Sequence, residues 1–137
     1  YRRLGRALDA AAAENAPEVA VVRLLLFTGA RLGEITGLRW EWVQPPRLIL
    51  PDSKTGPKTV WLNSPAVAVL ESLPGPKASG PVFPGGDGVD TPINLHRFWP
   101  RLRRSAALPD VRLHDLRHSF ASVAIADGMG LGPIGKL

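Results

Sequence analysis

The stretch of sequence that decides the fold is His114-Asp115-Leu116-Arg117-His118-Ser119-Phe120-Ala121-Ser122. Residues three and four apart share one face of a helix, so His114 lies one turn from both Arg117 and His118. An apolar stripe with the spacing i, i+4, i+7 and i+8 lies on another face: Leu116, Phe120, Val123 and Ala124. The helix therefore buries one side and presents imidazole and guanidinium groups near its N-terminus, where free N–H groups favour a phosphate.

The composition limits the kinds of partner. The chain has 137 residues, 45% of them hydrophobic, which is enough for one domain with a core. Seventeen Lys and Arg against twelve Asp and Glu give a net charge of +5. A basic balance favours a polyanion such as nucleic acid, although many basic domains carry such charge only for solubility.

Other compositional features exclude whole classes of site. The chain has no cysteine, which excludes disulfides and thiolate metal ligands. A membrane-spanning helix needs roughly 20 apolar residues. The longest candidate, Val19 to Phe27, is interrupted by Arg23. We expect a cytoplasmic protein without a membrane partner or a cofactor.

The first third of the chain reads as helices joined by a tight corner. Residues 1–15 are rich in helix-forming Ala, Leu and Arg, and Pro17 to Thr28 reads as a buried helix that ends at Gly29. A short helix over residues 32–37 follows directly after Arg31. An arginine in such a turn can be an ordinary surface residue, but Glu34 could orient it for bidentate contact with a phosphate.

The pattern then changes to the alternation of β-strands. Residues 47–50 and 58–62 read as two strands, and the turn-rich loop 51–57 between them places Lys54 near the tip of a hairpin. This lysine either discourages edge pairing or is carried to a substrate by the hairpin, and the local sequence favours neither interpretation. The predicted fold is mainly α-helical, with a small antiparallel hairpin or three-stranded sheet.

The second half reads as further helices around a loop. Ser64 to Leu73 is predicted as a helix with Ser64 as its N-cap, followed by the Gly- and Pro-rich residues 74–91. Within that loop, residues 82–84 could dock as a short strand or a hydrophobic tack. Another helix is predicted to start at Thr91-Pro92. Its C-terminal end carries a basic cluster, Arg101, Arg103 and Arg104. These residues either lie along a DNA backbone or are simply cations near a helix C-terminus, where positive charge is favourable.

The candidate groups Arg31, Lys54, His114 and Arg117 all bind or protonate phosphate oxygens without a metal. Their order and settings resemble the catalytic domain of the tyrosine recombinases, the phage integrase family. The matching segments are Thr28-Gly29-Ala30-Arg31-Leu32-Gly33-Glu34-Ile35 with Leu38-Arg39-Trp40, Ser53-Lys54-Thr55, and His114-Asp115-Leu116-Arg117-His118-Ser119-Phe120-Ala121. Each motif alone is weak, but three in the right order on a turn, a hairpin and a helix are specific.

The resemblance implies a tyrosine-recombinase fold and a mechanism. A tyrosine attacks the scissile phosphate of DNA, a 3′-phosphotyrosyl bond forms, and the 5′-hydroxyl leaves. Arg31 and Arg117 would then clamp the non-bridging oxygens of the transition state. Lys54 would protonate the leaving oxygen, and His114 would bind the phosphate and assist proton transfer. Glu34 and His118 would be supporting residues.

The resemblance also implies parts that this chain does not show. The family's further His or Trp and its nucleophilic Tyr follow the second arginine, whereas the only tyrosine here is Tyr1. We expect residues 1–137 to be a single catalytic domain that lacks the C-terminal nucleophile segment and the N-terminal core-binding domain. The chain by itself should not cleave DNA. Its expected partner is double-stranded DNA, with assembly into a tetramer on DNA in the full-length protein.

Two other interpretations remain open. The His114 and His118 pair has the i, i+4 spacing of a zinc site in a metal-dependent phosphohydrolase. Against it, no Glu follows His114, and Arg117 on the same side would repel a cation. The chain could also be a non-catalytic DNA-binding remnant of an integrase.

Overall fold

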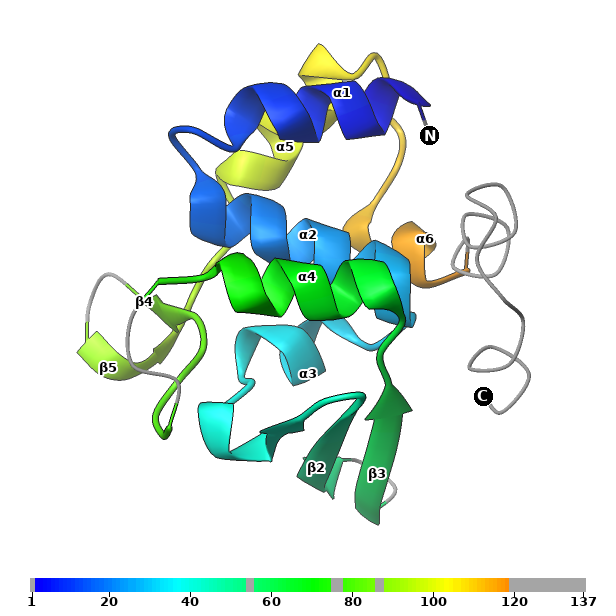
Figure 1. Ribbon diagram of the computed structural model, residues 1–137. Helices are drawn as coiled ribbons and strands as arrows, with labels where there is room; N and C mark the ends of the chain where they lie inside the picture. The colour runs from blue at the N-terminus through cyan, green and yellow to red at the C-terminus, as the bar shows by residue number, and fades with distance from the viewer. Residues whose placement is uncertain (1, 54–55, 75–77, 86–87, 119–137) are drawn as a thin grey trace.

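The computed structural model describes residues 2–53, 56–74, 78–85 and 88–118, and it is built mainly of helices, with two small sheets at the edges of the molecule (Figure 1). The first part comprises α1 (Arg2–Ala11), α2 (Ala16–Thr28), α3 (Leu32–Thr36), the 3₁₀ turn η1 (Trp40–Trp42), β1 (Val43–Gln44), β2 (Arg47–Ser53) and β3 (Gly56–Trp61). The second part comprises α4 (Ser64–Ser72), β4 (Pro84–Gly85), β5 (Gly88–Pro92), α5 (Phe98–Ser105) and α6 (Leu113–His118). The predicted fold class, helices with a small antiparallel sheet, is confirmed.

Helix α2 forms the centre of the molecule. It contacts α1, α3, α4 and α6, and in Figure 1 it runs between α1 and α3. Its sequence explains this position, because apolar residues surround it on all sides rather than on one stripe. The buried residues of α2 are Val19, Ala20, Val21, Val22, Leu24, Leu25, Leu26 and Thr28. Apart from Glu18 and Arg23, the helix is apolar on all its faces and is therefore covered by other elements over most of its surface.

The sheet β1-β2-β3 is antiparallel and confirms the predicted hairpin. Leu48 lies opposite Val60 in the register, and both side chains are buried. The ladder runs nearer to the turn than the sequence indicated, because Ser53 pairs with Gly56. Gly56 has φ of 97°, which an L side chain rarely adopts. Lys54 itself lies outside the described residues.

The N-terminus of α4 differs from the prediction that Ser64 caps it. Asn63 is the cap: its side-chain oxygen accepts the N–H of Ala66 at 3.0 Å. The amide nitrogen of Asn63 also donates to the carbonyl of Phe27 at 2.8 Å. An asparagine can do both because its side chain carries an acceptor and a donor, whereas Ser64 has a single hydroxyl. One side chain thus starts α4 and ties it to the end of α2.

The loop after α4 docks as predicted on its apolar residues, but the next helix starts later than predicted. Val82 and Phe83 are buried, and the N–H of Val82 donates to Leu38 O at 2.9 Å. Residues 88–92 form β5 and pair with β4, which keeps the chain extended where the sequence predicted a helix start at Thr91-Pro92. Helix α5 begins at Phe98, so Pro100 lies in its first turn, where its missing N–H breaks no helical hydrogen bond.

Helices α5 and α6 close the described part of the chain. Helix α5 packs on α1 and buries Phe98, Trp99 and Leu102. In α6, Leu116 has no exposed surface, as its place in the predicted stripe requires. The other stripe residues, Phe120, Val123 and Ala124, lie outside the described residues. No helix in the described ranges is both long enough and apolar enough to cross a bilayer.

Candidate active site

Arg31 lies at a rigid corner between two helices. Gly29 ends α2 in the left-handed conformation, with φ of 69°, and its N–H donates to Leu25 O at 3.1 Å. The hydroxyl of Thr28 donates to Leu24 O at 2.6 Å and accepts the N–H of Ala30 at 3.2 Å. Arg31 then takes extended backbone angles as the N-cap of α3, and its side chain is exposed. The backbone of the corner is fixed while the guanidinium is left on the surface.

Glu34 connects this corner to the sheet. Its Oε1 accepts the backbone N–H of Arg31 at 2.9 Å, and the Nζ of Lys58 on β3 lies 3.1 and 3.2 Å from its two carboxylate oxygens. The Glu34 side chain is only 11% exposed and that of Lys58 is 29% exposed. Burial raises the pKa of Glu34, but the Arg31 N–H and the Lys58 ammonium together outweigh it, and the net pKa is lowered. Glu34 is therefore held in its charged form.

Lys58 is a site residue that the sequence reasoning missed. It lies on β3 opposite Leu50, two residues before the buried Val60. Successive strand residues point to opposite faces, so Lys58 shares the core-facing side with Val60. A lysine at an inward position of an amphipathic strand needs a carboxylate partner. The alternation of the strand, with a lysine at an inward position, could have predicted that Lys58 needs a carboxylate partner, and Glu34 was already a candidate residue.

Helix α6 presents His114 in its first turn. His114 is the second residue of the helix and is exposed. Asp115 accepts the N–H of Arg112 at 2.9 Å, and its own N–H donates to the Arg112 carbonyl at 2.9 Å, which fixes where the helix starts. The Arg112 N–H is the main reason that the pKa of Asp115 is lowered. Arg117 and His118 lie on the described backbone of α6, but their side chains lie outside the description, as does Lys54.

The α3 corner and the start of α6 meet at one hollow of about 340 Å³. Leu32, which follows Arg31, and Leu113, which precedes His114, both line it, together with Trp99 and Arg103 of α5. Arg31 and His114 are not among the lining residues, although each is the sequence neighbour of one that is. The structure thus brings together two chain segments that are more than eighty positions apart.

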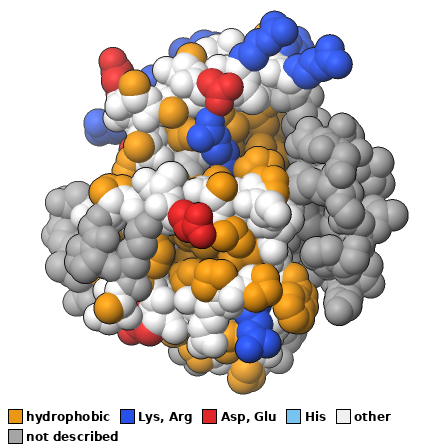
Figure 2. Space-filling view, viewed as in Figure 1, with side chains coloured by type: hydrophobic (Ala, Val, Ile, Leu, Met, Phe, Trp, Pro, Cys, Tyr) orange, Lys and Arg blue, Asp and Glu red, His pale blue; other side chains and the backbone are white. Residues whose placement is uncertain are grey.

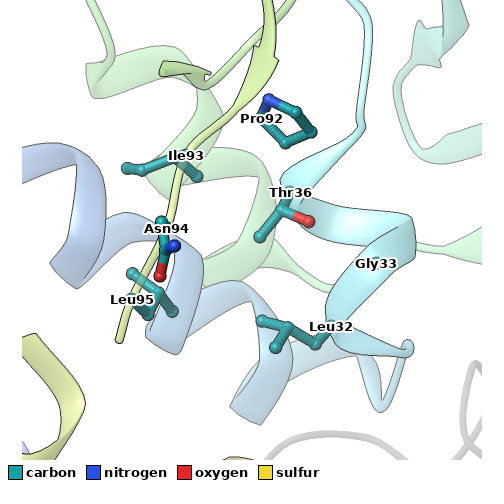
Figure 3. Close-up of a pocket in the computed structure, with 7 residues that line it drawn as sticks. All are labelled: Leu32, Gly33, Thr36, Pro92, Ile93, Asn94 and Leu95. Atoms are coloured by element: carbon teal, nitrogen blue, oxygen red, sulfur yellow. The ribbon is translucent and has the colours of Figure 1, made fainter. Parts of the chain in front are cut away.

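A second hollow continues the first along α3. It has a volume of about 430 Å³ and shares Leu32, Asn94 and Leu95 with the first. Figure 3 shows its walls, which come from α3 and from the segment after β5: Leu32, Gly33, Thr36, Pro92, Ile93, Asn94 and Leu95. Leu32 is 39% exposed. The surface beside Arg31 is therefore a largely apolar groove that ends near α6.

The predicted basic cluster on α5 divides into two kinds of residue. Arg101 and Arg104 are exposed, and the Nε of Arg101 donates to Arg97 O at 3.3 Å. Arg103 is half-buried, and its Nη1 donates to Val111 O at 3.2 Å. Basic side chains also lie elsewhere: on the face in Figure 2 several gather at the upper edge, over the start of α1, others are scattered, and hydrophobic side chains occupy much of the middle. The net charge is spread over more than one surface.

The metal-binding alternative built on His114 and His118 stays untested, because the His118 side chain lies outside the described residues. Among the side chains that the structure describes, no three His, Cys, Asp or Glu are grouped so that they could hold a metal ion. His96 is exposed, and its backbone N–H donates to Asn94 Oδ1 at 2.7 Å.

Comparisons with known proteins identify the fold. A crystal structure of XerA recombinase matches with a TM-score of 0.71 and 22% identity, covering 96% of this chain and 50% of that chain. The Tn1549 transposon integrase in complex with circular intermediate DNA matches with a TM-score of 0.61 and 14% identity, covering 92% of this chain and 51% of that chain. At these identities the two structures show the fold alone.

The same comparisons set limits on what the chain represents. It spans about half the length of each of these solved structures. Among curated proteins, no sequence matches. The model of the family described as "Phage integrase family" matches residues 2–137, which is nearly the whole sequence. The chain belongs to the phage integrase family.

Proposed function

We propose that residues 1–137 are part of the catalytic domain of a site-specific DNA recombinase that cuts and rejoins strands through a 3′-phosphotyrosyl intermediate. The family and the fold support site-specific recombination in general, and tyrosine recombinases are enzymes. The observation that carries the proposal furthest is the approach of the Arg31 corner and the start of α6 to one hollow. The two chain segments that hold three of the four candidate groups are thereby neighbours in space.

In this proposal, Arg31 and Arg117 bind the non-bridging oxygens of the scissile phosphate. A guanidinium offers paired N–H donors and a permanent positive charge, and both match a phosphorane that gains negative charge in the transition state. The fixed corner at Gly29 and Ala30 supports this role, because it sets the position of the backbone from which the Arg31 guanidinium extends. His114 binds the same phosphate and assists proton transfer.

Lys54 is the proposed proton donor to the departing 5′-oxygen. Support comes from its neighbours: Ser53 and Gly56 pair at the end of β2 and β3, so Lys54 belongs to the connection between two strands. Lys58 on the same hairpin is bonded to Glu34, and Glu34 is bonded to the Arg31 backbone. The hairpin that carries Lys54 is therefore anchored to the corner that carries Arg31. Glu34 and Lys58 are positioning residues, and we retain His118 as a supporting residue.

The nucleophile is proposed to come from outside these residues. The chain has one tyrosine, Tyr1, far in sequence from the second arginine. We propose that the 137 residues bind DNA without cleaving it, and that a tyrosine in a further segment of the full-length protein completes the site. A core-binding domain and a tetramer on DNA belong to the same proposal.

Double-stranded DNA is the proposed partner. The Tn1549 transposon integrase, a structural neighbour, was solved in complex with circular intermediate DNA. Here the exposed Arg101 and Arg104, with Arg103 between them, give α5 a basic end beside the hollow. Contacts of this kind follow the backbone and carry little sequence information. DNA affinity should fall steeply with salt, because bound cations are released from the phosphates.

The experiment that tests the function uses the full-length protein and a nicked DNA substrate that traps the covalent complex. We expect a 3′-phosphotyrosyl adduct with the wild type. Arg117→Ala should abolish the adduct while leaving most of the DNA binding. Normal adduct formation by Arg117→Ala would remove this residue from the site. DNA binding without any adduct in the wild type would favour the non-catalytic DNA-binding interpretation instead.

A further inference from the structure

One carbonyl group in the loop before α6 receives two hydrogen bonds from α5. The indole N–H of Trp99 donates to Val111 O at 3.2 Å, and Nη1 of Arg103 donates to the same oxygen at 3.2 Å. Trp99 and Arg103 are four residues apart, so they lie one turn apart on the same face of α5. Trp99 is only 5% exposed and Arg103 is half-buried. We call these two donors and their acceptor the Val111 clasp.

The clasp holds a loop whose backbone is fixed at several other points. Leu108 N donates to Arg103 O at 2.7 Å, and Val111 N donates to Leu108 O at 3.2 Å. Ala107, which directly precedes Leu108, has φ of 58°, a conformation that costs energy for a residue with a side chain. A strained conformation of this kind persists only where the surrounding contacts hold the backbone in place. The residues from the end of α5 to Val111 therefore form one rigid connection.

Val111 stands immediately before the group that starts α6. Arg112 and Asp115 bond each other through N–H and carboxylate groups at 2.9 Å, and His114 lies between them. Buried Leu116 fixes which face of α6 points to the core. Burial of one side chain sets the rotation of a short helix, but it does not by itself set the position of the helix along its axis. The clasp supplies that second constraint, three residues before His114 and six before Arg117.

We propose that Arg103, together with Trp99, is a positioning residue for the phosphate-binding groups of α6 and acts through Val111. This inference rests on the proposed function above and differs from the prediction that Arg103 serves with Arg101 and Arg104 as a DNA contact. The distinction is physical. A DNA contact acts through its charge, whereas the clasp acts through a donor directed at a carbonyl oxygen inside the protein.

The test compares Arg103→Met and Trp99→Phe with Arg6→Met in the full-length protein. Arg103→Met removes the donor but keeps an apolar stem, and Trp99→Phe removes the indole N–H but keeps an aromatic ring. Arg6→Met removes the same charge from an exposed position on α1. We expect both clasp variants to lower the cleavage rate at saturating DNA, by up to about a hundredfold for Arg103→Met, because a misplacement near 1 Å has effects of this size. The DNA concentration at half-saturation should stay unchanged.

Two further readouts separate positioning from charge and from general loss of stability. For Arg103→Met, the slope of log affinity against log salt should equal that of the wild type, whereas loss of a phosphate contact reduces it by about 1. In a double-mutant cycle with His114→Ala, the effects on cleavage rate should be strongly non-additive, because both act at one place. Arg103→Lys keeps the charge and a donor and should recover part of the rate.

Amide hydrogen exchange tests the clasp even if the wild type cleaves no DNA. Exchange at residues 111–116 should be faster in Arg103→Met and Trp99→Phe than in the wild type or Arg104→Met, while exchange in α2 stays the same. Unchanged exchange at residues 111–116 in both clasp variants would overturn the inference. A reduced salt slope for Arg103→Met with a normal rate at saturating DNA would also overturn it, in favour of a direct DNA contact.

Discussion

The two halves of the candidate site are held in different ways. The Arg31 corner is fixed by neighbours that are close in sequence, namely the Thr28 hydroxyl, the Gly29 turn and the Glu34 carboxylate, and by one ion pair to the sheet. The start of α6 is held by Leu116 in the core and by the Val111 clasp, whose donors lie on another helix. The first half is thus mostly local, and the second depends on packing between elements.

This difference has a consequence for function. A corner that its own backbone fixes keeps its geometry when distant parts of the chain move. A short helix whose position depends on contacts with other elements is expected to shift with changes at α5. We therefore expect substitutions around α6 to affect catalysis at a distance, and substitutions around Arg31 to affect it mainly through Arg31, Glu34 and Lys58.

The largest expected effect is that of Arg31→Ala on DNA cleavage. Loss of one preorganised donor to the transition state should slow adduct formation on the order of a thousandfold. DNA affinity should change little, since many contacts share it. Single-turnover rates and binding curves of the full-length protein measure both quantities, with Arg6→Ala as the control for loss of one positive charge. A small loss of rate would place Arg31 outside the site.

The next effect is on stability and tests the anchor of α6. Leu116 has no exposed surface, and Leu116→Ala should lower the free energy of unfolding by about 3 kcal/mol through lost burial and a cavity. Leu32→Ala is the matched control: Leu32 is 39% exposed, so its loss should cost less than about 1 kcal/mol. Urea unfolding gives both values. Equal losses would mean that α6 does not pack as described.

The Glu34–Lys58 pair should give a smaller effect that depends on pH. Glu34→Gln keeps an acceptor for the Arg31 N–H but removes the charge facing Lys58, and should cost about 1 to 2 kcal/mol of unfolding free energy at pH 7. The folded protein lowers the pKa of Glu34 below its ordinary value of 4.5. The stabilisation is therefore complete above pH 4.5 and is lost as the pH falls through the folded pKa.

Unfolding measured from pH 7 downwards should show the wild type and Glu34→Gln converging in acid. Lys58→Met completes the comparison, because the double variant should lose less than the sum of the two single variants. A constant difference between the wild type and Glu34→Gln at every pH would show that the carboxylate charge contributes nothing to stability.

The smallest effect concerns the cap of α4. Asn63→Ala removes the acceptor for Ala66 N–H and the donor to Phe27 O, and should cost about 1 kcal/mol. Ser64→Ala replaces an exposed residue in the first turn and should change the unfolding free energy by less than about 0.5 kcal/mol. Thermal or urea unfolding of the two variants decides between them. The reverse order would restore Ser64 as the cap.

The sequence predicted the elements that local interactions determine, and it failed where contacts with distant parts of the chain decide the structure. The α2 helix, the Gly29 corner and the hairpin were predicted because apolar periodicity, glycine and turn residues act over a few positions. The start of α5 was predicted six or seven residues too early, because pairing of β5 with β4 keeps residues 88–92 extended and no local signal reveals that partner.

For the candidate site, too, the sequence predicted local features but not contacts between distant elements. The sequence singled out Arg31, Glu34 and His114, and the structure shows the α3 and α6 starts meeting at one hollow. It did not reveal Lys58 as the partner of Glu34 or Val111 as the acceptor for Arg103, since each contact joins two elements whose relative placement only the packed core determines. The catalytic roles of Arg31, Lys54, His114 and Arg117 and the supporting roles of Glu34 and His118 all stay predictions.

The most direct test of the account is whether Arg31 and Arg117 act on one and the same phosphate. A DNA substrate with a neutral methylphosphonate at the scissile position lacks the negative charge that the two guanidinium groups are proposed to neutralise. In the full-length protein, Arg31→Ala and Arg117→Ala should both cleave this substrate much better, relative to ordinary DNA, than the wild type does. If neutralising that single position rescues Arg117→Ala but leaves Arg31→Ala inactive, the two arginines do not share a phosphate and the account is contradicted.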